Sequence, residues 1–204
     1  MSRRRVDMPQ PVCFRSTARN TRREKGDTMK KLLVIVDMQR DFVHGALGTA
    51  EAREILPRLE RKIRQARSEG IALAYTMDTH QADYLQTQEG KNLPVAHCIE
   101  GTEGWDLCPE LAALLQGAKI FRKPSFGSLE LGEYVKQEGF DRVELAGVCT
   151  GICVLSNAAL IKAYAPETEV VVDGTLCACV SPESHKTALQ AMRLIQVAVT
   201  EAAG

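Results

Sequence analysis

The segment that decides the fold reads Val143-Glu144-Leu145-Ala146-Gly147-Val148-Cys149-Thr150-Gly151-Ile152-Cys153-Val154. Its apolar first half predicts a buried strand, its small central residues predict a turn, and a helix is expected to begin near Cys153. In open α/β sheets ligands bind at the carboxyl ends of the strands, where the positive end of a helix favours a thiolate over a thiol. Cys153 is therefore a candidate nucleophile, although cysteines in such places are often buried and inert.

Charged residues end two other predicted strands. Asp37 follows the apolar strand 31–36, and Lys123 follows the strand 118–122. A carboxylate directly after a buried strand is costly unless a cation pairs with it. In one interpretation, Asp37 takes the proton of Cys153 while Lys123 holds the resulting anions in place. In the other, Asp37 and Lys123 form an ion pair that only closes the strand edge, and spacing alone does not separate the two.

Strand and helix patterns alternate from Met29 onward. Predicted strands cover 31–36, 71–77, 118–122, 143–148 and 169–174, and apolar residues at helical spacing predict helices over 50–69, 105–116, 129–138, 152–164 and 182–195. This order predicts an α/β fold, a three-layer, doubly wound (Rossmann-like), mainly parallel sheet with helices on both faces. The segment 81–103 shows little strand or helix pattern, which is typical of a loop that covers a functional site.

A second group of polar residues follows the strand 71–77. Asp78 and His80 alternate, so that both side chains leave the strand end on one side, and His97 lies farther along in the predicted loop. Two imidazoles and one carboxylate suit Zn, Fe or Mn. From the residues alone this signal is weak, and solvated loop residues are the better interpretation.

Three blocks of the sequence resemble the signature blocks of the isochorismatase-like cysteine hydrolase superfamily, above all of its nicotinamidase-related branch. The resemblance extends from about residue 29 to about residue 196 and keeps the family's order and separations. The blocks are Val36-Asp37-Met38-Gln39-Arg40-Asp41-Phe42, Lys123-Pro124-Ser125-Phe126 and Gly147-Val148-Cys149-Thr150-Gly151-Ile152-Cys153-Val154.

The resemblance implies a role for individual residues. The family's catalytic triad would be Asp37, Lys123 and Cys153, and its metal ligands would be Asp78, His80 and His97. A cis peptide would join Val148 to Cys149, and an oxyanion hole would be formed by the backbone N–H groups of Cys149 and Cys153. Phe42 matches a position that contacts the ring of the substrate. A divalent metal (Zn, Fe or Mn) is implied, and an organic cofactor is not.

The sequence departs from the family pattern in three places. Gly151 stands where Asp is common, Pro94 stands where nicotinamidases often have a ring-stacking aromatic residue, and 81–84 lacks the further histidine that some of them offer. The loss of one of two stacking faces is expected to cost a planar aromatic ligand about 1 kcal/mol of binding free energy. Nicotinamide is thus one candidate substrate among small amides.

The composition predicts a single enzyme domain over 29–204 after a basic, disordered tail over 1–28. Of the chain's 26 basic and 26 acidic residues, the tail holds eight basic and three acidic ones, so the enzyme domain is acidic. A basic tail can bind nucleic acid or direct targeting, but this one lacks interleaved aromatic residues and an apolar signal-peptide core. No apolar run is long enough to span a membrane. Seven cysteines without C-x-x-C pairs favour reduced thiols and a cytoplasmic location.

Together, the residues and the resemblance predict a cysteine hydrolase that cleaves a carbon–nitrogen (amide) bond of a small, neutral molecule through a thioester. The expected partner is this small substrate, with neither nucleic acid nor membrane, and the resemblance implies a homo-oligomer. Two alternatives stay open. One is an isochorismatase-type hydrolase of another small substrate, such as a vinyl ether, and the other is a catalytically silent homologue that binds a ligand.

Overall fold

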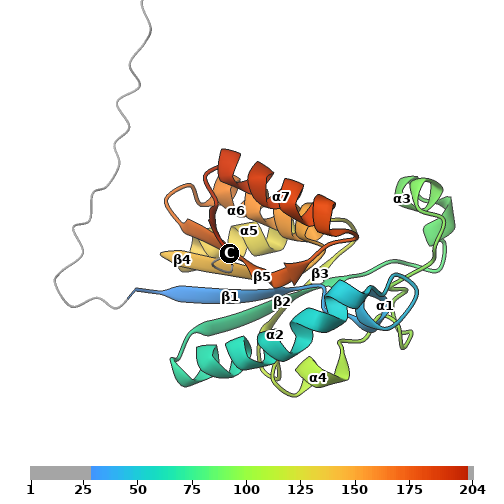
Figure 1. Cartoon of the computed structure of the whole chain (residues 1–204), viewed down its shortest axis with the longest axis horizontal. Helices are drawn as coiled ribbons and strands as arrows, with labels where there is room; N and C mark the ends of the chain where they lie inside the picture. The colour runs from blue at the N-terminus through green and yellow to red at the C-terminus, as the bar shows by residue number, and fades with distance from the viewer. Residues whose placement is uncertain (1–28, 202–204) are drawn as a thin grey trace, which may run out of the picture.

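Within residues 29–201, six strands form one sheet, and every neighbouring pair of strands is parallel. The structure, a computed structural model, describes these residues (Figure 1), so the tail predicted over 1–28 lies outside the described residues, as do residues 202–204. The strands, in their order across the sheet, are β3 (Lys119–Lys123), β2 (Ala72–Asp78), β1 (Lys31–Val36), β4 (Arg142–Val148), β5 (Glu169–Ala178) and β6 (Ala198–Thr200).

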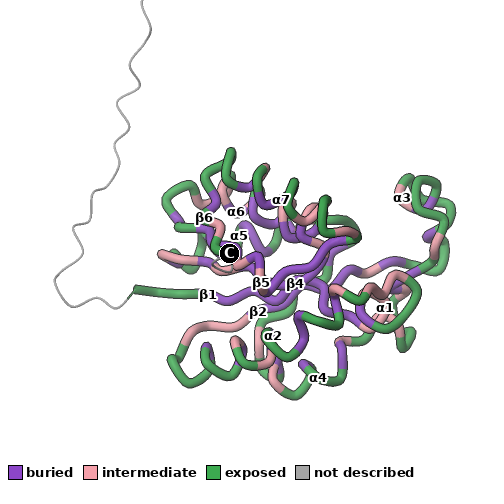
Figure 2. The backbone as a smooth tube through the Cα atoms, viewed as in Figure 1, coloured by how far each residue is buried: buried purple, intermediate pink, exposed green. Residues whose placement is uncertain are grey.

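Helices cover both faces of the sheet (Figure 1). One face carries α2 (Ala50–Ser68) and α4 (Pro109–Ala112), and the other carries α5 (Leu129–Glu138), α6 (Leu155–Tyr164) and α7 (Pro182–Leu194). Successive residues of β1 face opposite layers, so Leu33 belongs to the core under α2 and Val34 to the core under α5, α6 and α7. Figure 2 shows the strands buried between helices whose outer sides are exposed. The predicted three-layer α/β fold is confirmed, and all of its strands are parallel.

Side-chain caps define where the long helices begin. The hydroxyls of Thr49, Ser128 and Ser181 accept hydrogen bonds from backbone N–H groups in the first turns of α2, α5 and α7. Such a cap satisfies a donor that the helix itself leaves unpaired and contributes about 1 kcal/mol. These starts agree closely with the helices predicted from apolar spacing.

The strand order reverses direction between β1 and β4. From β1 the chain proceeds outward to β2 and β3, and from β4 it proceeds outward on the other side to β5 and β6. In doubly wound sheets this switch point opens a crevice at the carboxyl ends of the two strands. Gly147 permits their close approach, because it has φ 128° and a Cβ on it would lie 2.2 Å from the carbonyl oxygen of Val36.

Short helical elements follow the carboxyl ends of the strands. They are α1 (Arg40–Val43), the 3₁₀ turn η1 (Tyr84–Gln86), α3 (Gln88–Asn92) and the π-helical turn η2 (Thr150–Val154). The segment 81–103, predicted to be an irregular loop, therefore contains η1 and α3. The helix predicted over 152–164 starts within the π-helical turn η2. Its α-helical part, α6, begins at Leu155.

The helix predicted over 105–116 is wrong in extent, because only α4, Pro109–Ala112, is α-helical. Leu107, whose spacing suggested a helix, pairs with Gln39 in an antiparallel bridge, and the N–H of Cys108 donates to the carbonyl of Met38. Pro109, which has no N–H to donate, then starts the helix. Tertiary pairing thus overrides the leucine spacing. Among the described residues, no helix combines the length and the apolar character needed to cross a bilayer.

Candidate active site

The side chains of Asp37, Lys123 and Cys153 meet at the carboxyl edge of the sheet. Asp37 follows β1, Lys123 is the last residue of β3, and Cys153 lies in η2 after β4. The Nζ atom of Lys123 lies 2.7 Å from Oδ2 of Asp37 and 3.6 Å from Sγ of Cys153. All three side chains are buried. The structure therefore brings together the three residues that the sequence singled out as base, cation and nucleophile.

Asp37 is held by its own strand end and by β2. Its backbone is left-handed, with φ 49°, which turns the chain sharply at the end of β1. The hydroxyl of Thr76 donates to Oδ1 of Asp37 at 2.6 Å, and Oδ2 is left to face Lys123. The carboxylate is thus oriented by one hydrogen bond and one ion pair.

Burial dominates the protonation of these groups. It raises the pKa of Asp37, although the Lys123 ammonium opposes the shift. Burial alone would lower the pKa of Lys123, but the negative charges of Asp37 and Asp78 hold it above its usual range. Burial and the Asp37 carboxylate raise the pKa of the Cys153 thiol well above its usual value. These shifts oppose the expected effect of the helix end and favour a thiol, rather than a thiolate, beside the Asp37 carboxylate.

The turn that carries Cys153 begins with the predicted cis peptide, which the structure confirms between Val148 and Cys149. The carbonyl of Cys149 accepts hydrogen bonds from the N–H groups of Ile152 (3.0 Å) and Val154 (3.2 Å). Both bonds close the chain back on itself, so Cys149 and Cys153 lie on one tight turn. This turn is where the predicted oxyanion hole would have to form.

Gly151, the departure from the family pattern, has a packing explanation. A Cβ on this residue would lie 3.2 Å from the Cβ of Ala188 in α7 and 3.6 Å from Sγ of Cys179. Next to it, the buried hydroxyl of Thr150 is hydrogen-bonded to Nδ1 of His185, also in α7, at 2.8 Å. Helix α7 thus packs directly on the turn, and glycine leaves room for it.

Asn157 is a buried residue of α6 that the sequence did not single out. Its Nδ2 donates to the carbonyl of Cys153 at 2.8 Å, and its Oδ1 accepts from the N–H of Ser128 at 3.0 Å. The loop that ends at Ser128 begins at Lys123, whose Nζ donates to the Ser125 carbonyl at 3.0 Å. Asn157 therefore ties the backbone of Cys153 to the loop of Lys123. A polar residue four positions after Cys153 was the available signal, since it lies one helical turn away.

The three predicted metal ligands also converge. Nε2 of His80 lies 3.0 Å from Oδ2 of Asp78, and Nε2 of His97 lies 3.5 Å from the same oxygen. Oδ1 of Asp78 lies 3.2 Å from Nζ of Lys123, so this carboxylate contacts both halves of the site. Burial would raise the pKa of Asp78, but its bonds to His80 and His97 and the charge of Lys123 hold it below the usual range.

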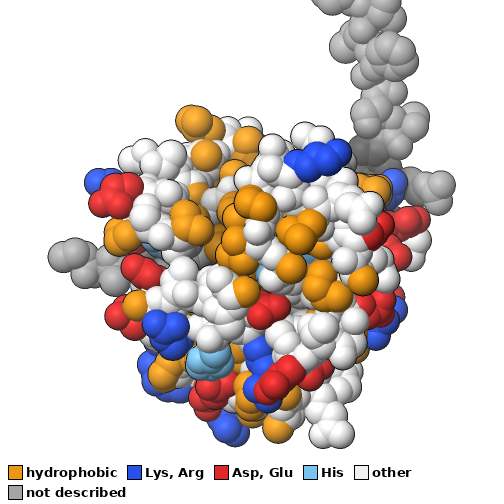
Figure 3. Space-filling model, turned by 90° about the vertical axis from the view of Figure 1, so that its right-hand side faces the viewer, with side chains coloured by type: hydrophobic (Ala, Val, Ile, Leu, Met, Phe, Trp, Pro, Cys, Tyr) orange, Lys and Arg blue, Asp and Glu red, His pale blue; other side chains and the backbone are white. Residues whose placement is uncertain are grey.

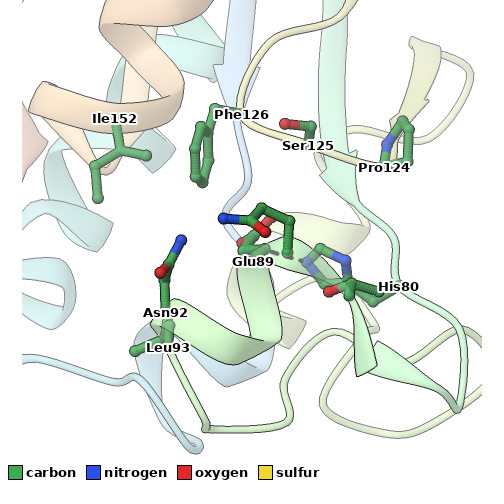
Figure 4. A pocket seen from close by; sticks show the side chains of 10 residues that line it. His80, Glu89, Asn92, Leu93, Pro124, Ser125, Phe126 and Ile152 are labelled. Atoms are coloured by element: carbon green, nitrogen blue, oxygen red, sulfur yellow. Dashed lines mark ion pairs between the residues drawn. The ribbon is translucent and has the colours of Figure 1, made fainter. Parts of the chain in front are cut away.

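Glu89 joins this cluster and was missed from the sequence. Its Oε1 lies 3.8 Å from Nε2 of His80, beside which it is drawn in Figure 4, and 4.0 Å from Nε2 of His97. Burial and the charge of Asp78 raise the pKa of Glu89. Ligand atoms of Asp78, His80, Glu89 and His97 all lie within 4.8 Å of one another. Glu89 escaped notice because it lies on α3, whose five residues have no apolar periodicity.

The segment after Asp37 holds the backbone of this second cluster. The buried amide of Gln39 donates to the carbonyl of Asp78 at 2.9 Å and accepts from its N–H at 2.7 Å. Oδ2 of Asp41 accepts from the N–H of Cys98, next to His97, at 2.7 Å. Nδ1 of His97 is 2.8 Å from the carbonyl of Val95, which leaves Nε2 to face Asp78. The sequence signal for these roles was the polar residues Gln39 and Asp41, which follow Asp37 at every second position.

A cavity of about 250 Å³ opens at Cys153. Phe42, the predicted substrate contact, lines it, and its ring centroid lies 5.5 Å from that of His97. Pro94 is exposed and is not among the lining residues, whereas its neighbour Leu93 is. Figure 3 looks onto the right-hand side of Figure 1, where α1 and α3 lie, and shows hydrophobic side chains gathered around the middle of this face.

Comparison with known proteins yields consistent matches. The isochorismatase domain model matches residues 31–204. The uncharacterized isochorismatase family protein PncA of Bacillus subtilis is 30% identical over 173 residues, 79% of this chain and 93% of that protein. The nicotinamidase/pyrazinamidase of Mycobacterium tuberculosis is 28% identical over 181 residues, 82% of this chain and 96% of that protein. The crystal structure of Pyrococcus horikoshii pyrazinamidase in complex with zinc, 26% identical, has a TM-score of 0.70 and covers 84% of this chain and 99% of its own.

Proposed function

This chain belongs to the isochorismatase family of hydrolases, and on that premise we propose that it is a cysteine hydrolase that cleaves the carbon–nitrogen bond of a small amide. The observation that carries the proposal is the buried contact of Lys123 with both Asp37 and Cys153. An ion pair that merely closed a strand edge would need no thiol against its cation. Nicotinamide is the first substrate to test, because relatives named nicotinamidase align over most of the chain.

In the proposed reaction Asp37 acts first as a base. Because the pKa of Cys153 is raised, the thiol keeps its proton until substrate is bound, and the Asp37 carboxylate then accepts it as Sγ attacks the carbonyl carbon. The N–H groups of Cys149 and Cys153 stabilise the oxyanion. Asp37 returns the proton to the leaving nitrogen as the C–N bond breaks, which leaves a thioester. Water, deprotonated by Asp37, hydrolyses the thioester and restores the thiol.

Lys123 acts throughout as a fixed positive charge. Its raised pKa keeps it charged across the working range of pH, so it does not serve as a proton donor. It stabilises the Asp37 carboxylate before the attack and the sulfur when negative charge reaches it. Its bond to the Ser125 carbonyl holds the ammonium at this position.

The second cluster fits a divalent metal. Asp78, His80, Glu89 and His97 supply two carboxylates and two imidazoles, a donor set that suits Zn, Fe or Mn. His97 has the backbone partner that metal-binding histidines usually have on the opposite nitrogen. These four residues would hold the ion, which when bound would polarise a water or a substrate nitrogen beside Cys153.

The test is release of ammonia from nicotinamide by the purified full chain, with and without added Zn²⁺, Mn²⁺ or Fe²⁺ and after chelation. We expect release that the Cys153→Ala variant abolishes while its circular dichroism spectrum stays unchanged. A fully active Cys153→Ala variant would overturn the proposal. If neither nicotinamide nor any other amide is cleaved but a vinyl ether is, the isochorismatase-type alternative holds. A chain that cleaves neither and binds ligand without turnover would be a silent homologue.

A further inference from the structure

A second cavity adjoins the one at Cys153. It has a volume of about 480 Å³, against about 250 Å³ for the inner cavity. Both cavities are lined by Glu89, Leu93, Phe126 and Ile152. In Figure 4, α3 lies across the outer cavity from Phe126 and Ile152. A molecule that reaches from Cys153 past these shared residues would enter the outer cavity.

The two cavities differ in chemistry. The inner one is walled chiefly by apolar side chains, namely Phe42, Leu47, Leu93, Phe126, Ile152 and Val180. The outer one adds uncharged polar side chains, namely Thr87, Gln88, Asn92 and Ser125. An inner wall of this kind fits a hydrocarbon or ring beside the scissile carbonyl. The outer wall fits a group that donates and accepts hydrogen bonds.

The amides of Gln88 and Asn92 are available to a ligand. Both residues are exposed, and within 29–201 neither side chain hydrogen-bonds to another protein group. Figure 4 shows the amide of Asn92 extending from α3 into the cavity toward Phe126. Since each amide offers donors and an acceptor, the pair can bind another amide or a hydroxyl without any charge.

Apart from a metal ion held by Asp78, His80, Glu89 and His97, neither cavity offers a cation for an anionic substrate. Among the described residues that line them there is no Lys or Arg, and the carboxylates of Asp78 and Glu89 are present. The imidazoles of His80 and His97 already face those carboxylates. A substrate carboxylate held at Gln88 and Asn92, which are not ligands of that ion, would lose hydration without gaining a positive partner.

We infer that the substrate is an uncharged, two-part amide whose apolar part lies in the inner cavity and whose distal polar, uncharged group is bound by Gln88 and Asn92. This inference rests on the proposed function. It extends that function because nicotinamide has only an acceptor nitrogen within its ring and no separate distal group that both donates and accepts hydrogen bonds.

The test compares three homologous series with the metal-loaded full chain. One contains the diamides succinamide, glutaramide and adipamide, the second their half-acids, and the third the simple amides from butyramide to hexanamide. We expect kcat/KM for the best diamide to exceed that of its half-acid about tenfold, because the carboxylate loses part of its hydration beside Glu89 without gaining a positive partner. In the Asn92→Ala variant, the diamide-to-monoamide ratio of kcat/KM should fall about fivefold, as loss of one hydrogen bond implies.

Gln190→Ala, which removes an exposed amide of α7, is the matched control and should leave that ratio unchanged. Half-acids cleaved as well as diamides would overturn the inference, as would an unchanged ratio in both Asn92→Ala and Gln88→Ala. If nicotinamide is cleaved in a Cys153-dependent manner but no amide of the three series is, the inference alone fails, and if neither nicotinamide nor any of these amides is cleaved, the proposed function itself fails. The two failures are therefore distinguishable.

Discussion

The two halves of the site are built from different parts of the fold. Asp37, Lys123 and Cys153 stand at the ends of β1, β3 and β4, whereas His97 and Glu89 come from the segment between β2 and β3. Asp78, the last residue of β2, contacts both halves through its two oxygens. The first half is positioned by the register of the sheet. The second also depends on how the segment 81–103 packs.

This difference decides how each half should respond to change. Loss of a charge in the strand-end half leaves its buried partners unpaired within a rigid sheet, so both stability and activity should suffer. In the other half, loss of Glu89 affects a group that is partly exposed and carried by a helix of five residues, α3, whereas Asp78, His80 and His97 are buried. Effects there should fall mainly on metal binding.

The Lys123→Met variant is expected to show the largest effect. It removes the cation between Asp37 and Asp78, two buried carboxylates, and should lower the free energy of unfolding by about 3–5 kcal/mol. Amide hydrolysis should fall about 100- to 1,000-fold, because the fixed charge beside Cys153 is lost. Urea denaturation and initial rates measure the two effects. A variant as stable as the wild type would show that the two carboxylates do not rely on Lys123.

Asn157→Asp should have the next largest effect. The substitution preserves shape but replaces the donor to the Cys153 carbonyl with an acceptor, and it leaves the bond from Ser128 possible. We expect kcat to fall about 10- to 100-fold through misplacement of the nucleophile, with a smaller change in KM. Gln190→Glu, which changes an exposed amide of α7 to a carboxylate, is the matched control for folding. Equal losses in kcat and in thermal stability for Asn157→Asp and Asn157→Ala would contradict the positioning role.

The Glu89→Gln variant tests the candidate metal cluster, the half of the site that depends on the segment 81–103. It keeps the size of the side chain but removes a charge near His80 and His97, and zinc affinity should fall about tenfold. Isothermal titration calorimetry of the chelator-treated protein measures the affinity. The free energy of unfolding without metal should change by less than about 1 kcal/mol, because Glu89 is only partly buried. Unchanged zinc binding would exclude Glu89 from the ligand set.

The same contrast explains what the sequence could predict. The positions of Asp37, Asp78 and Lys123 could be predicted, because each follows or ends an apolar strand. Parallel strands bring their carboxyl ends to one edge of the sheet, so these side chains had to lie near one another. The family resemblance then supplied roles that spacing alone left open. Glu89 and Asn157 could not be found in this way, since their partners are defined by tertiary packing. The leucine spacing after Trp105 predicted too long a helix for the same reason. Leu107 pairs with Gln39 in a bridge and does not belong to a helix.

The pH profile should show the smallest effect and separates two accounts of Cys153. If the resting group is a thiol and Asp37 is the base, kcat/KM falls only as the pH drops through the raised pKa of Asp37, above its ordinary value of 3.8. No alkaline limb is expected up to pH 9.0, the ordinary thiol value, because burial raises the pKa of Cys153 and neighbouring anions raise that of Lys123. Rates between pH 7 and pH 9 should then differ less than about twofold. A rise that instead follows titration of a thiol would mean that the thiolate forms before substrate binds, and Asp37 would lose its role as the base.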